Sequence, residues 1–79
     1  MRSLARLVAP YGIPANCIAP GYIDSGSAPR EELEAAVKRI PAGYIGTVEE
    51  TAAVVRFLVS DEARYINGAN IQISGAWGI

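Results

Sequence analysis

Few side chains in this 79-residue chain could carry acid–base, nucleophilic or metal chemistry. There is no histidine, and Cys17 is the only cysteine, so neither an intrachain disulfide nor a metal site of the usual Cys/His type is expected. Cys17 stands in the apolar run Cys17-Ile18-Ala19, which favours a buried structural thiol over a reactive one. We therefore predict no metal ligand and a reducing, cytoplasmic environment.

Two glycine-containing segments could meet a ligand through the backbone. Pro20-Gly21 follows an apolar run directly, and ligands of doubly wound sheets bind beyond the carboxyl ends of the strands. Taken alone, Pro-Gly is also typical of an ordinary turn. Gly43-Tyr-Ile-Gly46 is the nearest approach to a phosphate-binding loop, but it lies between two expected helices rather than between a strand and a helix. We do not expect it to bind phosphate.

Residues 1–12 predict a helix with a marked end and no marked start. Pro10 and Gly12 end it, because proline lacks the amide donor and glycine readily takes a left-handed conformation. No N-cap residue precedes the helical pattern, so we expect the tail of a longer helix and a truncated domain over 1–79. The apolar stripe of this helix consists of Leu4, Leu7, Val8 and Tyr11.

Strands are expected on either side of a mixed segment. Residues 13–19 form a nearly continuous apolar run, typical of a parallel strand buried on both faces, in which Asn16 must satisfy its amide internally. Residues 20–46 predict a loop and a short surface helix. Residues 70–74 alternate as a last strand.

A capped helix over 47–60 should connect these strands. Thr47 and Glu50 have the spacing of a capping box, and the apolar stripe behind them should be buried. The order of elements predicts an α/β fold with two parallel strands and a right-handed crossover. The stripe consists of Ala52, Val55, Leu58 and Val59.

Composition excludes several classes of function. Seven basic and eight acidic residues are spread along the chain, which argues against nucleic-acid binding. No apolar run approaches the roughly 20 residues of a membrane span. A chain of this length buries only about 60% of its unfolded surface. We therefore expect either an oligomer or a larger protein that contains this segment.

Five further segments occur together in a fixed order and spacing. They are LARLVAPYGI (4–13), NCIAPG (16–21), RIPAGYIGTVEE (39–50), FLVSDEA (57–63) and YINGANIQISG (65–75). Together they resemble the end of short-chain dehydrogenases/reductases, from the late part of the fifth helix to the last strand. Within that family the chain is similar to the 3-oxoacyl-acyl-carrier-protein reductases, and the resemblance makes residues 20–46 a cofactor and substrate loop with its helix.

The resemblance implies an oxidoreductase that passes a hydride between NAD or NADP and an alcohol or carbonyl carbon. It implies a partial Rossmann-type fold, the last βαβ portion of a doubly wound parallel sheet. It also implies cofactor contacts at Pro20, Gly21, Ile23 and Ser25, with the backbone at Ile23 pairing with the nicotinamide carboxamide and Ser25 matching a family threonine.

The chain departs from the family where catalysis is concerned. The family's catalytic tyrosine is followed four residues later by a lysine that lowers its pKa, and none of the four tyrosines here has that neighbour. The catalytic serine and the glycine-rich cofactor loop have no counterpart either. Ser74-Gly75-Ala76 stands where the family prefers an aspartate and two glycines. We expect no catalytic residue and no tight cofactor binding by the chain alone.

Three hypotheses follow from this pattern. The chain is a C-terminal fragment of an oxidoreductase, inactive by itself. Alternatively, it is a non-enzymatic module that forms homo-oligomers through Thr47–Val59 and Asn70–Ile79, including Trp77. As a third possibility, an upstream fragment supplies the missing groups as a separate, complementing chain.

Overall fold

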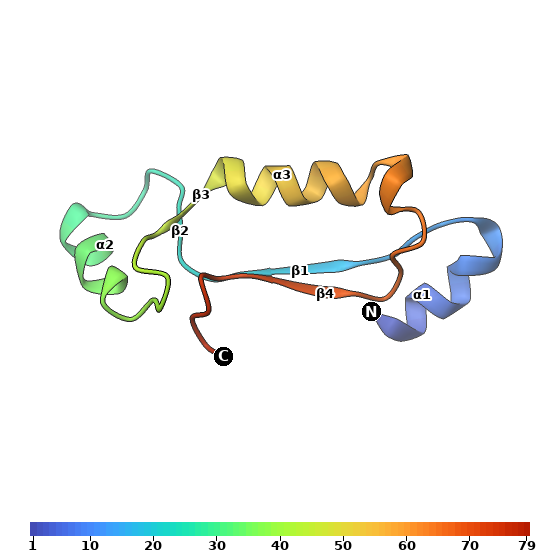
Figure 1. Cartoon of the computed structure of the whole chain (residues 1–79), viewed down its shortest axis with the longest axis horizontal. Coiled ribbons are helices and arrows are strands. Elements are labelled where there is room, and N and C mark those ends of the chain that lie inside the picture. Colours follow the sequence, from blue (N-terminus) through green and yellow to red (C-terminus); the bar gives the residue numbers. More distant parts are fainter.

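A computed structural model describes residues 1–79 and shows an elongated α/β arrangement with two small parallel sheets (Figure 1). The strand β1 pairs with β4, and β2 pairs with β3. The helix α3 lies along one side of the β1–β4 pair, while α1 and α2 lie at opposite ends of the molecule (Figure 1). In chain order the elements, with η for a 3-10 helix, are α1 (Arg2–Val8), η1 (Ala9–Tyr11), β1 (Cys17–Pro20), β2 (Ile23–Asp24), α2 (Arg30–Val37), β3 (Gly46–Thr47), α3 (Val48–Leu58), η2 (Asp61–Ala63) and β4 (Asn70–Ile73).

The main sheet confirms the predicted parallel pair. Cys17 lies opposite Asn70 and Pro20 opposite Ile73, so both strands run in the same direction with their carboxyl ends together. Parallel neighbours need a long crossover connection, and here the chain between them includes α2 and α3.

The predicted strand over 13–19 is wrong in its limits and in its burial. β1 begins only at Cys17 and runs to Pro20, and its residues are half-buried or exposed. Before it, the amide of Ala15 donates to the Asn67 side chain at 3.0 Å rather than to a strand partner. Expected burial on both faces fails because only α3 covers this sheet.

Asn16 satisfies its side-chain amide within the protein, as predicted. Its Nδ2 donates to the Ile66 carbonyl oxygen at 3.0 Å, and its Oδ1 accepts from the Ala69 amide at 3.0 Å. These two bonds join the segments that precede β1 and β4. A polar residue in an apolar run is therefore a structural tie between the two strands.

The start of α3 also agrees with the sequence. The Thr47 hydroxyl accepts from the Glu50 amide at 3.1 Å, and a Glu50 carboxylate oxygen accepts from the Thr47 amide at 2.8 Å. The expected burial of the apolar stripe behind this cap is wrong in part, because Val55 is exposed and Val59 is 78% exposed. The spacing of apolar residues therefore predicts the helix correctly, but it does not predict which side chains other elements bury.

The same holds for α1, and the chain as a whole has almost no core. Leu7 of the α1 stripe is 70% exposed. The accessible surface is 5979 Å², against about 4,600 Å² for a compact monomer of this mass, and the radius of gyration is 15.2 Å, against about 12 Å. No helix has the length and apolar character to cross a membrane. The only buried residues are Ala5, Ala36, Ile40 and Ala63.

Candidate functional site

The carboxyl ends of β1 and β4 meet in a close backbone contact. The Gly21 amide donates to the Ile73 carbonyl oxygen at 2.9 Å. A Cβ placed on Gly21 would lie 3.1 Å from the Ser74 Cβ and 3.3 Å from Trp77 Cε3, tighter than side-chain carbons normally approach. Pro20-Gly21 is thus more than a generic turn, because the absence of a side chain at Gly21 allows the segment after β1 to lie in close contact with the segment after β4.

Directly after this contact, the short strand β2 holds Ile23. The Tyr22 carbonyl oxygen accepts from the Gly46 amide at 3.0 Å, and Ile23 lies opposite Gly46 in the parallel ladder. Successive residues of a parallel strand direct their N–H and C=O groups to opposite sides. The backbone groups of Ile23 therefore point away from β3, where they are free to meet a ligand.

The sequence did not predict this β2–β3 pairing, although Gly46 is required for it. A Cβ on Gly46 would stand 2.8 Å from Ile23 Cδ1, so the side chain of Ile23 occupies the space that glycine leaves. The sequence predicts no phosphate binding at the segment around Gly43 and Gly46. Gly46 instead serves as the partner that fixes Ile23.

Ser25 lies on an exposed turn beyond β2. Its hydroxyl is 3.0 Å from that of Ser27, and the Asp24 carboxylate accepts from the Gly26 amide at 2.9 Å. Of the predicted cofactor residues, Pro20, Gly21 and Ile23 follow one another along the same edge. Ser25 stands at its outer rim, and none of the four lines an enclosed hollow.

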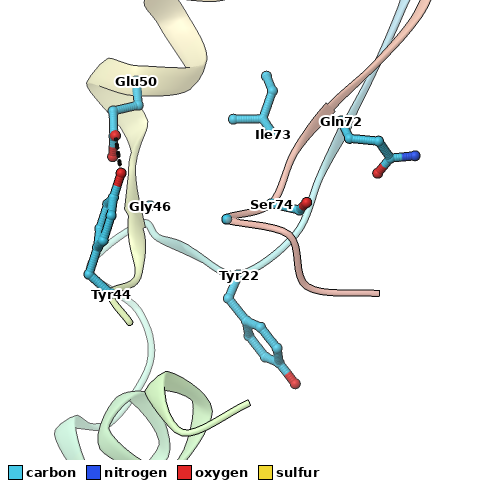
Figure 2. A pocket seen from close by; sticks show the side chains of 8 residues that line it. Tyr22, Tyr44, Gly46, Glu50, Gln72, Ile73 and Ser74 are labelled. Carbon is cyan, nitrogen blue, oxygen red and sulfur yellow. Dashed lines mark hydrogen bonds between the residues drawn. The ribbon is translucent and has the colours of Figure 1, made fainter. Parts of the chain in front are cut away.

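A hollow of about 230 Å³ lies beside this edge, between the end of β4 and the start of α3 (Figure 2). Tyr44 and Glu50 meet on one of its walls, where the Tyr44 hydroxyl donates to the Glu50 carboxylate at 3.1 Å (Figure 2). Its lining residues are Tyr22, Tyr44, Gly46, Glu50, Gln72, Ile73, Ser74 and Gly75.

The hydrogen bonds that Glu50 accepts shift the pKa of both Glu50 and Tyr44. The amide of Thr47, followed by the Tyr44 hydroxyl, stabilises the carboxylate and lowers the pKa of Glu50. Donating to that carboxylate raises the pKa of Tyr44. A tyrosine that exchanges a proton near neutral pH needs a lowered pKa, so Tyr44 is unsuited to be the family's acid–base residue. The sequence signal for this pair was a tyrosine just before the capping box.

An aromatic pair closes the site on the side of the C-terminal segment. The rings of Tyr22 and Trp77 are 4.9 Å apart at 64°, an edge-to-face arrangement. Arg39 Nη1 donates to the Tyr22 hydroxyl at 3.4 Å. Sequence reasoning placed Trp77 only on an oligomer surface, because nothing in a linear pattern indicates that residues 22 and 77 meet.

Two further hollows lie away from this edge. One, of about 340 Å³, separates α1 from the turn at Asn67-Gly68 and is bordered by Arg2 and Arg6. The other, of about 320 Å³, lies where α3 faces β1 and is largely apolar, with Ile18 and Leu58 among its lining residues. No group of three or more His, Cys, Asp or Glu side chains could hold a metal ion.

Comparison with known proteins places this geometry in context. Residues 1–77 match the family described as enoyl-(acyl carrier protein) reductase. The chain is 43% identical over 77 residues to 3-oxoacyl-(acyl-carrier-protein) reductase FabG of Pseudomonas aeruginosa, covering 94% of this chain and 31% of that protein. It is 43% identical over 81 residues to the reductase MabA of Mycobacterium tuberculosis, covering 99% of this chain and 33% of MabA. It therefore spans about a third of the length of the curated relatives it matches.

Proposed function

This chain belongs to the enoyl-(acyl carrier protein) reductase family of short-chain dehydrogenases/reductases, and from that premise we propose that it supplies the C-terminal part of an NAD(P)-dependent oxidoreductase. The assembled enzyme would act on an alcohol or carbonyl carbon, and the names of the relatives favour the 3-oxo group of a carrier-bound acyl chain. The observation that carries this proposal is the edge at Pro20–Ile23, beyond the end of the parallel strand β1. Gly21 allows a close backbone contact with the end of β4 there, and the N–H and C=O groups of Ile23 are unpaired next to it.

The residues at this edge fit a nicotinamide carboxamide. A primary carboxamide offers one carbonyl acceptor and two N–H donors. The free N–H and C=O of Ile23 form the complementary donor and acceptor, and the exposed hydroxyl of Ser25 can add a contact at the rim. The cofactor, when bound, supplies the hydride. The role of this chain is to hold and orient its ring.

Proton transfer must come from outside the chain. None of its tyrosines is followed by a lysine at the fourth position, and Tyr44 has its pKa raised by Glu50. No glycine-rich strand–turn–helix is present to bind the pyrophosphate. We therefore propose that the chain alone catalyses no turnover, and that another polypeptide segment provides these groups.

The free edge of β1 and the apolar hollow next to it are where we place that segment. β1 has β4 on one side only, and an unpaired strand edge readily accepts another strand. Parallel sheets are normally covered on both faces. The surface in excess of a compact monomer, about 1,400 Å² on this chain, is more than the roughly 800 Å² that each partner of a standard stable interface buries.

A homo-oligomerisation module is the second candidate function. Large apolar side chains on Thr47–Val59 and Asn70–Ile79 face solvent, among them Phe57 and Trp77. Light scattering at micromolar concentration tests this alternative. A dimer that is broken by Phe57→Glu but not by Glu49→Gln would support it, whereas a monomer would count against it.

A chimera tests the main proposal. The segment of the Pseudomonas aeruginosa relative that matches this chain is replaced by the chain itself, and nicotinamide-dependent reduction of a 3-oxoacyl substrate is measured. We expect reduction by the chimera, none by the 79-residue chain, and a large loss in the Gly21→Val chimera. A folded chimera that binds no NAD(P)H, or turnover by the chain alone, would refute the proposal.

A further inference from the structure

The last six residues form a turn that is anchored to the segment that follows α2. The Trp77 amide donates to the Ser74 carbonyl oxygen at 3.0 Å, and the Ala42 amide donates to the Gly75 carbonyl oxygen at 3.0 Å. A Cβ on Gly75 would lie 2.8 Å from Cγ2 of the buried Ile40. The turn is therefore seated tightly against the segment that follows α2.

Trp77 projects from this turn onto the two residues that precede Ile23. Its ring packs edge-to-face on Tyr22 at 4.9 Å. Its Cε3 lies 3.3 Å from the place a Cβ would take on Gly21. Arg39 donates to the Tyr22 hydroxyl at 3.4 Å. Tyr22 is thus held between the C-terminal turn and the segment after α2, and Ile23 comes next in the chain.

The backbone of the turn carries one further sign that this placement is specified. Ala76 has φ 73°, a left-handed conformation that is uncommon for a residue with a side chain. Such a conformation persists where surrounding contacts over-determine it. Here those contacts are the Trp77 ring on Tyr22 and the hydrogen bonds of Trp77 and Gly75.

We propose that Trp77 is a positioning residue for the nicotinamide-binding edge. It holds the Gly21–Tyr22 backbone against β4, and so keeps the N–H and C=O of Ile23 aimed at the carboxamide. The proposal rests on the proposed function for the cofactor, but the holding of the loop can be measured without any cofactor.

Two amides report on that holding in the full 79-residue chain. Gly21 donates to Ile73, and Gly46 donates to Tyr22, so their hydrogen exchange slows only while the loop is in place. In Trp77→Ala we expect exchange at both amides to become about tenfold faster, the scale of a lost aromatic pair, while α3 amides change less than about twofold. Trp77→Phe keeps a ring and should preserve the slow exchange.

Two results would overturn the proposal. One is unchanged exchange at Gly21 and Gly46 in Trp77→Ala. The other is equal acceleration throughout α3, which would make Trp77 a general stabiliser. In the first case, an accompanying change of mass would identify Trp77 as a subunit contact.

The chimera provides the readout on function. In Trp77→Ala we expect the KM for the nicotinamide cofactor to rise about tenfold with kcat nearly unchanged, and Trp77→Phe to restore it. If the wild-type chimera binds no cofactor, the proposed function fails, and with it the cofactor part of this inference. The exchange experiment still decides separately whether Trp77 holds the loop.

Discussion

Replacing Asn16 by alanine should weaken the chain more than any other single polar truncation. The substitution removes two hydrogen bonds, to Ile66 and Ala69, each 3.0 Å long and half-buried. At about 1 kcal/mol per bond, the loss is about 2 kcal/mol of the free energy of unfolding. Because only Ala5, Ala36, Ile40 and Ala63 are buried and even complete domains are marginally stable, this loss is a large share of the stability of the chain.

Urea unfolding followed through the fluorescence of Trp77, the only tryptophan, measures this loss. Asn70→Ala is the matched control, because Asn70 is exposed and its side chain makes no hydrogen bond within the chain. Asn16→Asp separates the two bonds: it keeps the acceptor for the Ala69 amide but loses the donor to Ile66. If Asn16→Ala destabilises no more than Asn70→Ala, the tie between the strands is not a source of stability, and the reasoning is refuted.

Three other outcomes follow from the same structure. Ala76→Gly should raise the free energy of unfolding by about 0.5–1 kcal/mol, because it relieves a left-handed alanine; a lower thermal midpoint would contradict this. Gly21→Val should cost about 1–3 kcal/mol by overpacking against Ser74, whereas the Cβ of Gly26→Ala meets no atom and leaves only backbone strain. Since the pKa of Glu50 is lowered from 4.5, its contribution to stability is present above pH 4.5 and lost as the pH falls through the lowered value. Glu50→Gln should remove that part of the pH dependence of the melting temperature, and an unchanged profile would show that the carboxylate does not stabilise the helix start.

Local signals predicted the parts of this fold that depend on neighbours in sequence. Thr47 and Glu50 are three residues apart, and their capping box formed as expected. Asn16 could be assigned a structural role because a lone amide in an apolar run needs internal partners. The parallel pairing followed from the order of the elements, since parallel strands need a helical crossover.

Contacts between residues far apart in the chain could not be predicted from the sequence. The Tyr22–Trp77 pair joins residues 55 positions apart, and neither ring lies in a periodic pattern that points to the other. β2 and β3 are only two residues each, too short for any alternation to show. The cofactor residues stay a prediction from the family resemblance, and the close approaches of Gly46 to Ile23 and of Trp77 to Gly21 are visible only in the three-dimensional structure.

The burial predictions failed in a consistent direction, and that direction is informative. Val55 and Val59 have the spacing of a covered face, yet they are exposed in this chain. An isolated two-stranded sheet is marginally stable in water, and side chains of this kind gain stability only when apolar surface leaves water. The exposed apolar pattern thus supports the proposal that further strands pack on the surface of α3 and β1. If the chain gains a compact radius of gyration on binding the remaining portion of a relative, the mismatch between pattern and burial disappears. If it binds and stays extended, the exposed faces must serve contacts between copies instead.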